Sequence, residues 1–375
     1  MLKVNAGSDT RFAAVSRILL PGLVFQSVIV GGGYGTGREI AEFFLGHGPV
    51  GGLLGMLVAC LVWGLVLSVA FEFARITKSY NYRDFFQQLL GRFWSLFEVI
   101  YLLIALLVLA VLGAGAGEMA SSALGVSNDV GALTLMLAVS ALVYFGSKAI
   151  ERVLAMWSVL LYLVYAFFLI WIVSAFGQDI GHQLGAGEVT GNWTLDGVRY
   201  AAYNLNALAA VLFVLPALKT RKQAIGSGFL AGVIGIVPGI FVFIAMLAQY
   251  PQITQMPVPV TSLLQSLNAL WFMLIFQIVL FGTFIETGTG IIHSINERIA
   301  SVLAEKQQAF NPNRRLLLAV CILLVAVFLA GKVGIINLIA SGYGLLSYGF
   351  IVVVLLPLLT YGVWRIIRYR GDEAE

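Results

Sequence analysis

The sequence predicts an all-α integral membrane protein with ten transmembrane helices, and three observations lead to this fold class. First, 60% of the 375 residues are hydrophobic and 11% are charged, whereas a soluble domain carries about 25% charged residues. Second, the hydrophobic residues form long continuous runs, unlike the alternating strands of an outer-membrane barrel. Third, a spanning helix needs about 20 apolar residues, and the hydrophobic residues of this chain are numerous enough for roughly ten such helices. Residues 1–375 are therefore expected to form one transmembrane domain with almost no soluble part.

The ten predicted helices are apolar runs separated by charged breaks or by breaks rich in Gly and Pro. They cover residues 13–45, 50–76, 93–122, 129–147, 153–176, 195–217, 224–249, 267–298, 314–331 and 335–364. The first is too long for one ordinary span, which indicates an interruption within it.

Two connections between these helices also have a pattern. Residues 82–91 carry apolar side chains at helical spacing, which predicts an interfacial helix on the cytoplasmic side. Residues 252–267 hold two prolines and no charge, which is typical of a short helix over an outer vestibule. An ordinary apolar loop explains the second segment equally well.

The basic residues indicate the orientation of the chain. If the N-terminus is cytoplasmic, 19 of the 22 Lys and Arg residues fall in cytoplasmic segments, and the exceptions are Arg38, Arg199 and Lys332. Both termini are therefore expected in the cytoplasm. No organellar targeting segment is visible, so a bacterial inner membrane is the expected location. The topology accounts for the net charge of +4, and no nucleic-acid partner is expected.

The sequence lacks the catalytic or metal-binding residues that several classes of enzyme need. Cys60 and Cys321 lie in apolar runs and the three histidines are scattered, so neither a disulfide framework nor a zinc site is expected. The spans hold no paired-aspartate, Ser–Lys or His–Glu metal constellation, and no phosphate-binding P-loop occurs. We therefore expect neither an enzyme nor an ATP-driven pump, and no cofactor beyond a sodium ion or a proton as coupling ion.

The first span contains the sequence VGGGYGTGRE at residues 30–39, with five glycines in seven residues. Because each glycine costs a helix about 1 kcal/mol relative to alanine, we expect two half-helices that meet at an unwound centre. A glycine-rich face packed against a neighbouring helix is the alternative, but such faces space their glycines by four. A half-helix beginning near Gly35 would present free N–H groups to a carboxylate, and the carbonyls near residues 29–31 suit a cation.

The sixth span contains a second polar stretch, YNLN, at residues 203–206. Such residues are costly in lipid, so they are expected to face an interior cavity. A polar rung that bonds to a neighbouring helix is the alternative. The second five helices start on the opposite side of the membrane, so residues 12–176 and 195–364 are expected to form inverted repeats. Each repeat opens with an interrupted helix, which is typical of a transporter binding site.

These two motifs give the chain a family resemblance. VGGGYGTGRE in the first span with YNLN in the sixth resembles the YkvI-like family of the amino acid–polyamine–organocation superfamily, over essentially the whole chain. The resemblance implies a LeuT-type fold of five plus five inverted helices, interrupted in helices 1 and 6. It also implies that the first interruption holds a substrate carboxylate and the sixth lines the side-chain pocket. Carried onto this sequence, the substrate-binding residues would be Gly31, Gly32, Gly33, Tyr34, Gly35, Tyr203, Asn204 and Asn206.

The same resemblance implies a gate and a coupling site. Arg38 stands where such carriers have an outer-gate arginine, but the tenth helix has no acidic partner for it. The carboxylates that would have to pair with Arg38 instead are Glu39, Glu42 and Glu118. A cation site would lie between the first interruption and hydroxyl groups of the eighth helix, and its residues would be Ile29, Gly32, Thr287 and Thr289.

Glu286 is the other residue of the expected coupling site. It lies well inside the eighth span, where an ionised carboxylate costs about 2.5 kcal/mol or more. It would supply charge to the cation site or carry a proton in place of sodium. A buried acid bonded to a neighbour is the alternative.

Together these features predict a secondary active transporter. We expect it to move an amino acid or a related small zwitterion or amine by alternating access, coupled to sodium or protons. A channel and a ligand sensor descended from a carrier are the alternatives. The expected partners are a small-molecule substrate and the lipid bilayer, and the sequence leaves open whether the chain is a monomer or a homodimer.

Overall fold

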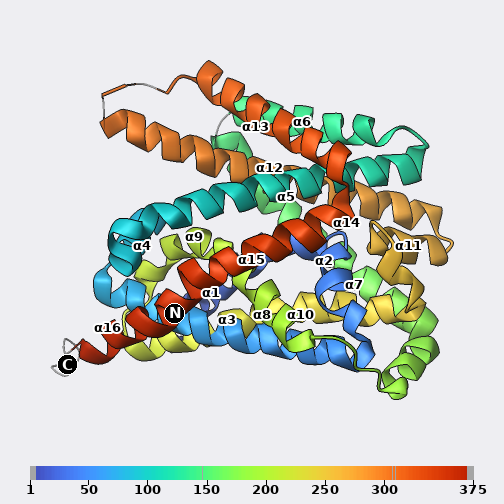
Figure 1. The fold of residues 1–375 in the computed structure, drawn as a ribbon, viewed down its shortest axis with the longest axis horizontal. Helices are drawn as coiled ribbons and strands as arrows, with labels where there is room; N and C mark the ends of the chain where they lie inside the picture. Colours follow the sequence, from blue (N-terminus) through green and yellow to red (C-terminus); the bar gives the residue numbers. More distant parts are fainter. Residues whose placement is uncertain (1–5, 146, 306, 309, 370–375) are drawn as a thin grey trace, which may run out of the picture.

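The computed structural model describes residues 6–145, 147–305, 307–308 and 310–369, and all the regular structure in this part of the chain is helical (Figure 1). Within it, eight helical segments are long and apolar enough to cross a membrane. Two of the predicted spans, 13–45 and 129–147, correspond to shorter apolar helices, Ser16–Ile29 and Asn128–Tyr144. The prediction of an all-helical membrane protein is confirmed.

Seven long helices match predicted segments closely. They are α3 (Pro49–Thr77), α5 (Trp94–Leu124), α6 (Asn128–Phe145), α7 (Ser147–Ala186), α10 (Arg221–Met246), α12 (Leu270–Glu305) and α13 (Pro312–Val333). The largest difference is in α7, which was predicted to end at residue 176 and instead bends at Phe176 and continues. Polar residues beyond the bend extend the helix past the apolar run from which its end was predicted.

The first, sixth and tenth predicted helices are irregular. The first consists of α1 (Ala6–Ile29), a π-helical turn (Val30–Tyr34) and α2 (Arg38–Phe43). The sixth consists of α8 (Trp193–Asn204), a 3₁₀ turn (Leu205–Ala207), α9 (Leu208–Val211) and a second 3₁₀ segment (Leu212–Ala217). The tenth consists of α14 (Ile335–Asn337), a π-helical segment (Leu338–Tyr343), α15 (Gly344–Phe350), two further π-helical segments (Ile351–Leu355 and Leu358–Gly362) and α16 (Val363–Arg368). The interruptions predicted in the first and sixth helices are therefore present as changes of helix type.

Short helices lie in the connections. The predicted interfacial helix is α4 (Tyr82–Leu90), which is capped by the Asn81 side chain and buries Phe85 and Phe86. The segment predicted as a short helix or a loop contains α11 (Pro259–Ser266). The remaining short elements are 3₁₀ turns at Leu45–His47, Gly91–Phe93, Leu247–Gln249 and Gln252–Gln255.

The long helices form two packing groups, which Figure 1 shows as its lower and upper halves. In one group α1, α3, α8 and α10 pack against each other, and in the other α5, α6, α12 and α13 do so. Glycines bring α10 and α3 together: a Cβ added at Gly228 would overlap the Ser68 backbone, and one at Gly232 would lie 2.5 Å from the Gly64 nitrogen. The interrupted part of the first helix lies between the two groups, because its π-helical turn contacts both α10 and α12.

Candidate functional site

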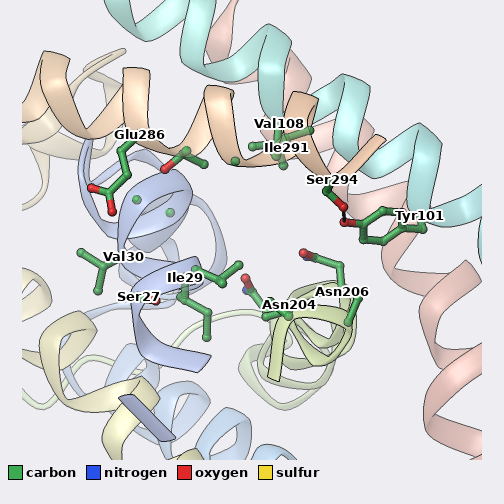
Figure 2. Close-up of a pocket in the computed structure, with 18 of the residues that line it drawn as sticks. Ser27, Ile29, Val30, Tyr101, Val108, Asn204, Asn206, Glu286, Ile291 and Ser294 are labelled. Carbon is green, nitrogen blue, oxygen red and sulfur yellow. Dashed lines mark hydrogen bonds between the residues drawn. The ribbon is translucent and has the colours of Figure 1, made fainter. Parts of the chain in front are cut away.

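A cavity of about 870 Å³ lies between the two packing groups. Its walls come from the end of α1 and the π-helical turn, from α8 and α9, from α12, and from parts of α5 and α7. Figure 2 shows Asn204 and Asn206 on one wall and Glu286 on the wall opposite. A cavity inside the protein is the place where irregular membrane-embedded backbone is tolerated.

The break in the first helix lies later in the chain than predicted. Gly31 and Gly33 remain helical within the π-helical turn, and the chain leaves the helix at Gly35 and turns at Gly37, whose φ is 75°. A π turn still pairs backbone groups, and this pairing is required inside a membrane. The interruption therefore lies at residues 35–37, at the end of the glycine-rich motif.

Several groups around Gly35 form hydrogen bonds within the protein. The Gly35 carbonyl accepts a hydrogen bond from the Tyr165 hydroxyl at 2.8 Å. The amide of Arg38, the first residue of α2, donates to Thr36 Oγ1 at 3.1 Å. Tyr34 points toward α10, where its hydroxyl donates to the Gly235 carbonyl at 2.9 Å. Neither Tyr34 nor Gly35 lines the cavity, and the contacts of Gly32 lie outside the described part of the structure.

Glu39 occupies the place that was expected to receive a substrate carboxylate. Its side chain folds back onto the glycine run, so that a Cβ added at Gly33 would overlap Glu39 Oε2 and lie 3.0 Å from the carboxyl carbon. The Tyr203 hydroxyl donates a hydrogen bond to the same oxygen. The carboxyl group lines the cavity although Glu39 is only 2% exposed. The sequence analysis placed Glu39 at a gate, but the structure places it beside the substrate-binding candidates.

The polar residues of the sixth helix line the cavity as the sequence analysis expected. The Asn204 amide donates to the Tyr200 carbonyl at 3.0 Å, and the Asn206 amide donates to the Tyr203 carbonyl at 2.7 Å. In both bonds the side-chain nitrogen donates to a backbone carbonyl of the same helical segment. Figure 2 shows both side chains pointing into the cavity. Their side-chain oxygens are therefore placed to accept from a ligand.

Tyr343 is a cavity residue that the sequence analysis missed. It ends the π-helical segment of the tenth helix, and its ring centroid lies 4.8 Å from that of Tyr203. The residue is fully buried, lines the cavity, and has no hydrogen-bond partner for its hydroxyl among the described residues. The SGYG sequence at residues 341–344, a polar and glycine-rich stretch within an apolar span, is the signal that could have identified it.

Of the residues expected to bind a coupling ion, three line the cavity and Thr289 is buried away from it. Ile29, Glu286 and Thr287 line the cavity, and Figure 2 shows the Glu286 carboxyl group pointing toward the turn that carries Ile29. A Cβ added at Gly31 would overlap Thr287 Oγ1, so this hydroxyl lies directly against the first helix. Thr289 is fully buried and does not line the cavity, because two residues rotate a helix by about 200°.

Thr283 replaces Thr289 on the cavity face. It lies one helical turn before Thr287 and lines the cavity. Thr283 and Thr287 are therefore the pair of hydroxyls that this face presents to the cavity, and Thr289 lies outside it.

Arg38 joins the first helix to the segment before α11. Its guanidinium donates to the carbonyls of Thr254 at 2.6 Å and Met256 at 3.1 Å, and it forms an ion pair with Glu42 at 2.7 Å. Of the three carboxylates considered for this pairing, only Glu42 makes it. The carboxylate of Glu118 instead accepts from the amide of Asn128, at the connection between α5 and α6.

The opposite end of the cavity lies beside α4. Asn81, Arg83 and Asp84 line it there together with Glu297 and Arg298 from the end of α12. Asp84 and Glu297 are exposed, so the cavity opens at this end. Figure 2 shows the hydrogen bond between Tyr101 and Ser294, at 3.3 Å, on the way to this mouth.

Comparison with known proteins finds a relative in sequence and similar folds among solved structures. No family model matches the chain. It is 24% identical over 330 residues to the uncharacterized membrane protein YkvI of Bacillus subtilis (strain 168), which covers 87% of this chain and 90% of that protein.

Two of the structural neighbours are transporters. The fold is similar to that of the Eremococcus coleocola manganese transporter, in a crystal structure of its complex with an aromatic bis-isothiourea substituted compound. The TM-score is 0.54 at 13% sequence identity, and the alignment covers 96% of this chain and 81% of the manganese transporter. The fold is also similar to a substrate-bound outward-open Na⁺-coupled sialic acid symporter, with a TM-score of 0.51 and 13% identity, covering 93% of this chain and 86% of that one. The chain is therefore similar to YkvI over most of its length, and it has the LeuT-like fold that these two transporters share.

Proposed function

We propose that this protein is a secondary active transporter of an amino acid or a related small zwitterion or amine, working by alternating access. The observation that carries the proposal is the cavity at the two interrupted helices, which contains polar side chains and is open at one end and closed at the other. The membrane transporters among the structural neighbours support the general class.

The proposal includes a topology of ten spans. In it the irregular first helix and the shorter helix α6 also cross the bilayer, residues 12–176 and 195–364 form inverted repeats, and both termini are cytoplasmic. The concentration of 19 of the 22 basic residues on one side supports this orientation, with a bacterial inner membrane as the location.

The two packing groups supply the moving parts. The group of α1, α3, α8 and α10 would rock against the group of α5, α6, α12 and α13, because the cavity lies between them. Each group is tightly packed within itself, and such packing favours movement of the groups as rigid bodies.

In this topology the structure is open toward the cytoplasm. The mouth lined by Arg83 and Arg298 belongs to segments with cytoplasmic charge bias. The external end is closed where Arg38 bonds to two backbone carbonyls and where the Val260 amide donates to the Thr36 carbonyl at 3.2 Å. A cavity closed at one end supports alternating access over an open channel.

Coupling to sodium or protons is the second part of the proposal. Thr283, Glu286 and Thr287 line the cavity on the α12 face that contacts the π-helical turn, and they supply oxygen ligands of the kind that a hard cation prefers. Glu286 would serve sodium as a counter-charge, or it would carry a proton itself.

The first test is thermal stability of the purified protein against amino acids and amines, in sodium or choline buffer at two pH values. A ligand at 100 times its Kd stabilises the folded state by about 2.7 kcal/mol. We expect a shift with one class of compound, which sodium or pH modifies. No shift with any compound would contradict the proposed function.

A further inference from the structure

We infer that the substrate is held through a positively charged amino group, and that Glu39, Tyr203 and Tyr343 form the ammonium subsite. This inference rests on the proposed transport function and narrows its substrate class. It departs from the expectation that the glycine run binds a carboxylate.

The first argument is that the Glu39 carboxyl group already occupies the space beside the glycine run. The Glu39 carboxyl group lies against Gly33 and is held there by the Tyr203 hydroxyl. A substrate carboxylate at the same position would face a second carboxyl group at van der Waals distance, and two such groups cannot both be ionised without strong repulsion. An ammonium group at that position would instead meet a hydrogen-bond acceptor and would favour the ionised form of the Glu39 carboxyl group.

The second argument is the distribution of charge around the cavity. Glu39 and Glu286 lie along its inner part, at the glycine run and opposite it. At the mouth beside α4, the guanidinium groups of Arg83 and Arg298 are balanced by the carboxylates of Asp84 and Glu297, and these are the guanidinium groups among the described lining residues. Arg298 also pairs with Glu98 at 2.6 Å. A cationic ligand would therefore gain in electrostatic energy as it moves from the mouth to the inner part of the cavity.

His293 is the remaining titratable lining residue on α12 with a basic side chain. It lies seven residues after Glu286, about two helical turns closer to the mouth, so it does not supply a cation at the glycine run.

The third argument is the number of acceptors. A primary ammonium group has three N–H donors. Glu39 supplies one acceptor, and the buried Tyr343 hydroxyl, which has no partner among the described residues, supplies a second. The Asn204 side-chain oxygen, on the same wall, supplies a third. The rings of Tyr203 and Tyr343, 4.8 Å apart, add faces of the kind that attract cations.

The test uses matched compounds and the full-length protein in detergent. For each of several amino acids we would compare the amino acid, its carboxamide, which keeps the ammonium group and removes the negative charge, and the deaminated acid. Thermal shift would measure binding, and counterflow in proteoliposomes would measure transport. We expect the carboxamide to bind at least as tightly as the amino acid and the deaminated acid not to bind.

Two variants test the residues. Glu39→Gln keeps an acceptor for Tyr203 but removes the charge, and it should weaken carboxamide binding at least tenfold. Glu118→Gln, on a carboxylate outside the cavity, is the matched control and should bind like the unmodified protein. Should Glu39→Gln fail to fold, Tyr343→Phe removes one acceptor from the subsite and should weaken carboxamide binding several-fold.

The outcomes separate this inference from the proposed function. If the deaminated acid binds and exchanges while the carboxamide does not, transport stands and the ammonium subsite is wrong. Unchanged carboxamide affinity in Glu39→Gln would overturn the inference in the same way. If no compound of the panel binds or exchanges, the proposed transport function fails and the inference fails with it.

Discussion

Adding a single methyl group at Gly33 tests whether the Glu39 carboxyl group lies against the glycine run. In Gly33→Ala the new Cβ would overlap Glu39 Oε2 and lie 3.0 Å from the carboxyl carbon, whereas carbon atoms in contact prefer about 3.5–4.0 Å. The carboxyl group must therefore move by about 0.5–1 Å, which stretches its hydrogen bond from Tyr203.

The expected cost follows from these contacts. Overpacking costs about 1–3 kcal/mol, and losing a hydrogen bond to a charged group costs about 1.5–3 kcal/mol. The higher helix propensity of alanine returns about 0.5–1 kcal/mol. We expect Gly33→Ala to reduce the free energy of unfolding by about 2–4 kcal/mol.

A double-mutant cycle makes this prediction specific. In a Glu39→Ala background the obstructing carboxyl group is absent, so Gly33→Ala should be nearly neutral, with a coupling energy of about 2–3 kcal/mol. The assay is denaturant unfolding of the four proteins in the same detergent. Gly226→Ala is the control, because a Cβ there meets nothing within 4 Å. Additive effects of Gly33→Ala and Glu39→Ala would show that the carboxyl group lies elsewhere.

Three further predictions follow from other contacts. Gly31→Ala should destabilise the protein by about 1–3 kcal/mol because its Cβ overlaps Thr287 Oγ1, and a second change, Thr287→Ala, should restore stability; no restoration would refute the contact. Arg38→Gln removes charged hydrogen bonds to two loop carbonyls, so amide hydrogen exchange in residues 252–266 should rise at least about tenfold, and unchanged protection would count against this closure. Burial of the Tyr250 side chain, and secondly its hydrogen bond to Glu188, raise the pKa of Tyr250 to about 12. The contribution of Tyr250 to the stability of the folded protein is therefore complete below pH 10 and is lost as the pH rises to about 12. An absorbance titration should show that Tyr250→Phe removes one tyrosine that ionises near pH 12, and the loss of one that ionises near pH 10 would be the contrary result.

Much of the fold could be predicted because the bilayer leaves the chain few choices. Long apolar runs must form helices, so segments such as α3 and α13 match their predicted ranges within two residues. The same constraint explains the error in the first helix. Glycine propensity favours unwinding at residues 31–35, but unpaired backbone is costly in a membrane, so the chain adopts a π turn and breaks at the first point where side chains supply partners.

The candidate site could be predicted only where a polar residue stands out in an apolar helix. Asn204, Asn206 and Glu286 were found in this way, and all three line the cavity. The direction of a side chain depends on helix phase and on neighbours distant in sequence. Sequence reasoning therefore placed Glu39 at a gate and Thr289 in the cation site, while Tyr343, an aromatic residue in a span rich in large side chains, gave too weak a signal.

Counterflow tests the central claim of a carrier most directly. The full-length protein would be reconstituted into liposomes preloaded with the unlabelled compound that gives the largest thermal shift, and uptake of the labelled compound would be followed. The account predicts a transient accumulation that requires the internal compound, because a cavity open to one side at a time exchanges substrate across the membrane. Uptake that is insensitive to the internal compound would indicate a channel, and binding without uptake would indicate a sensor; either result would contradict the account.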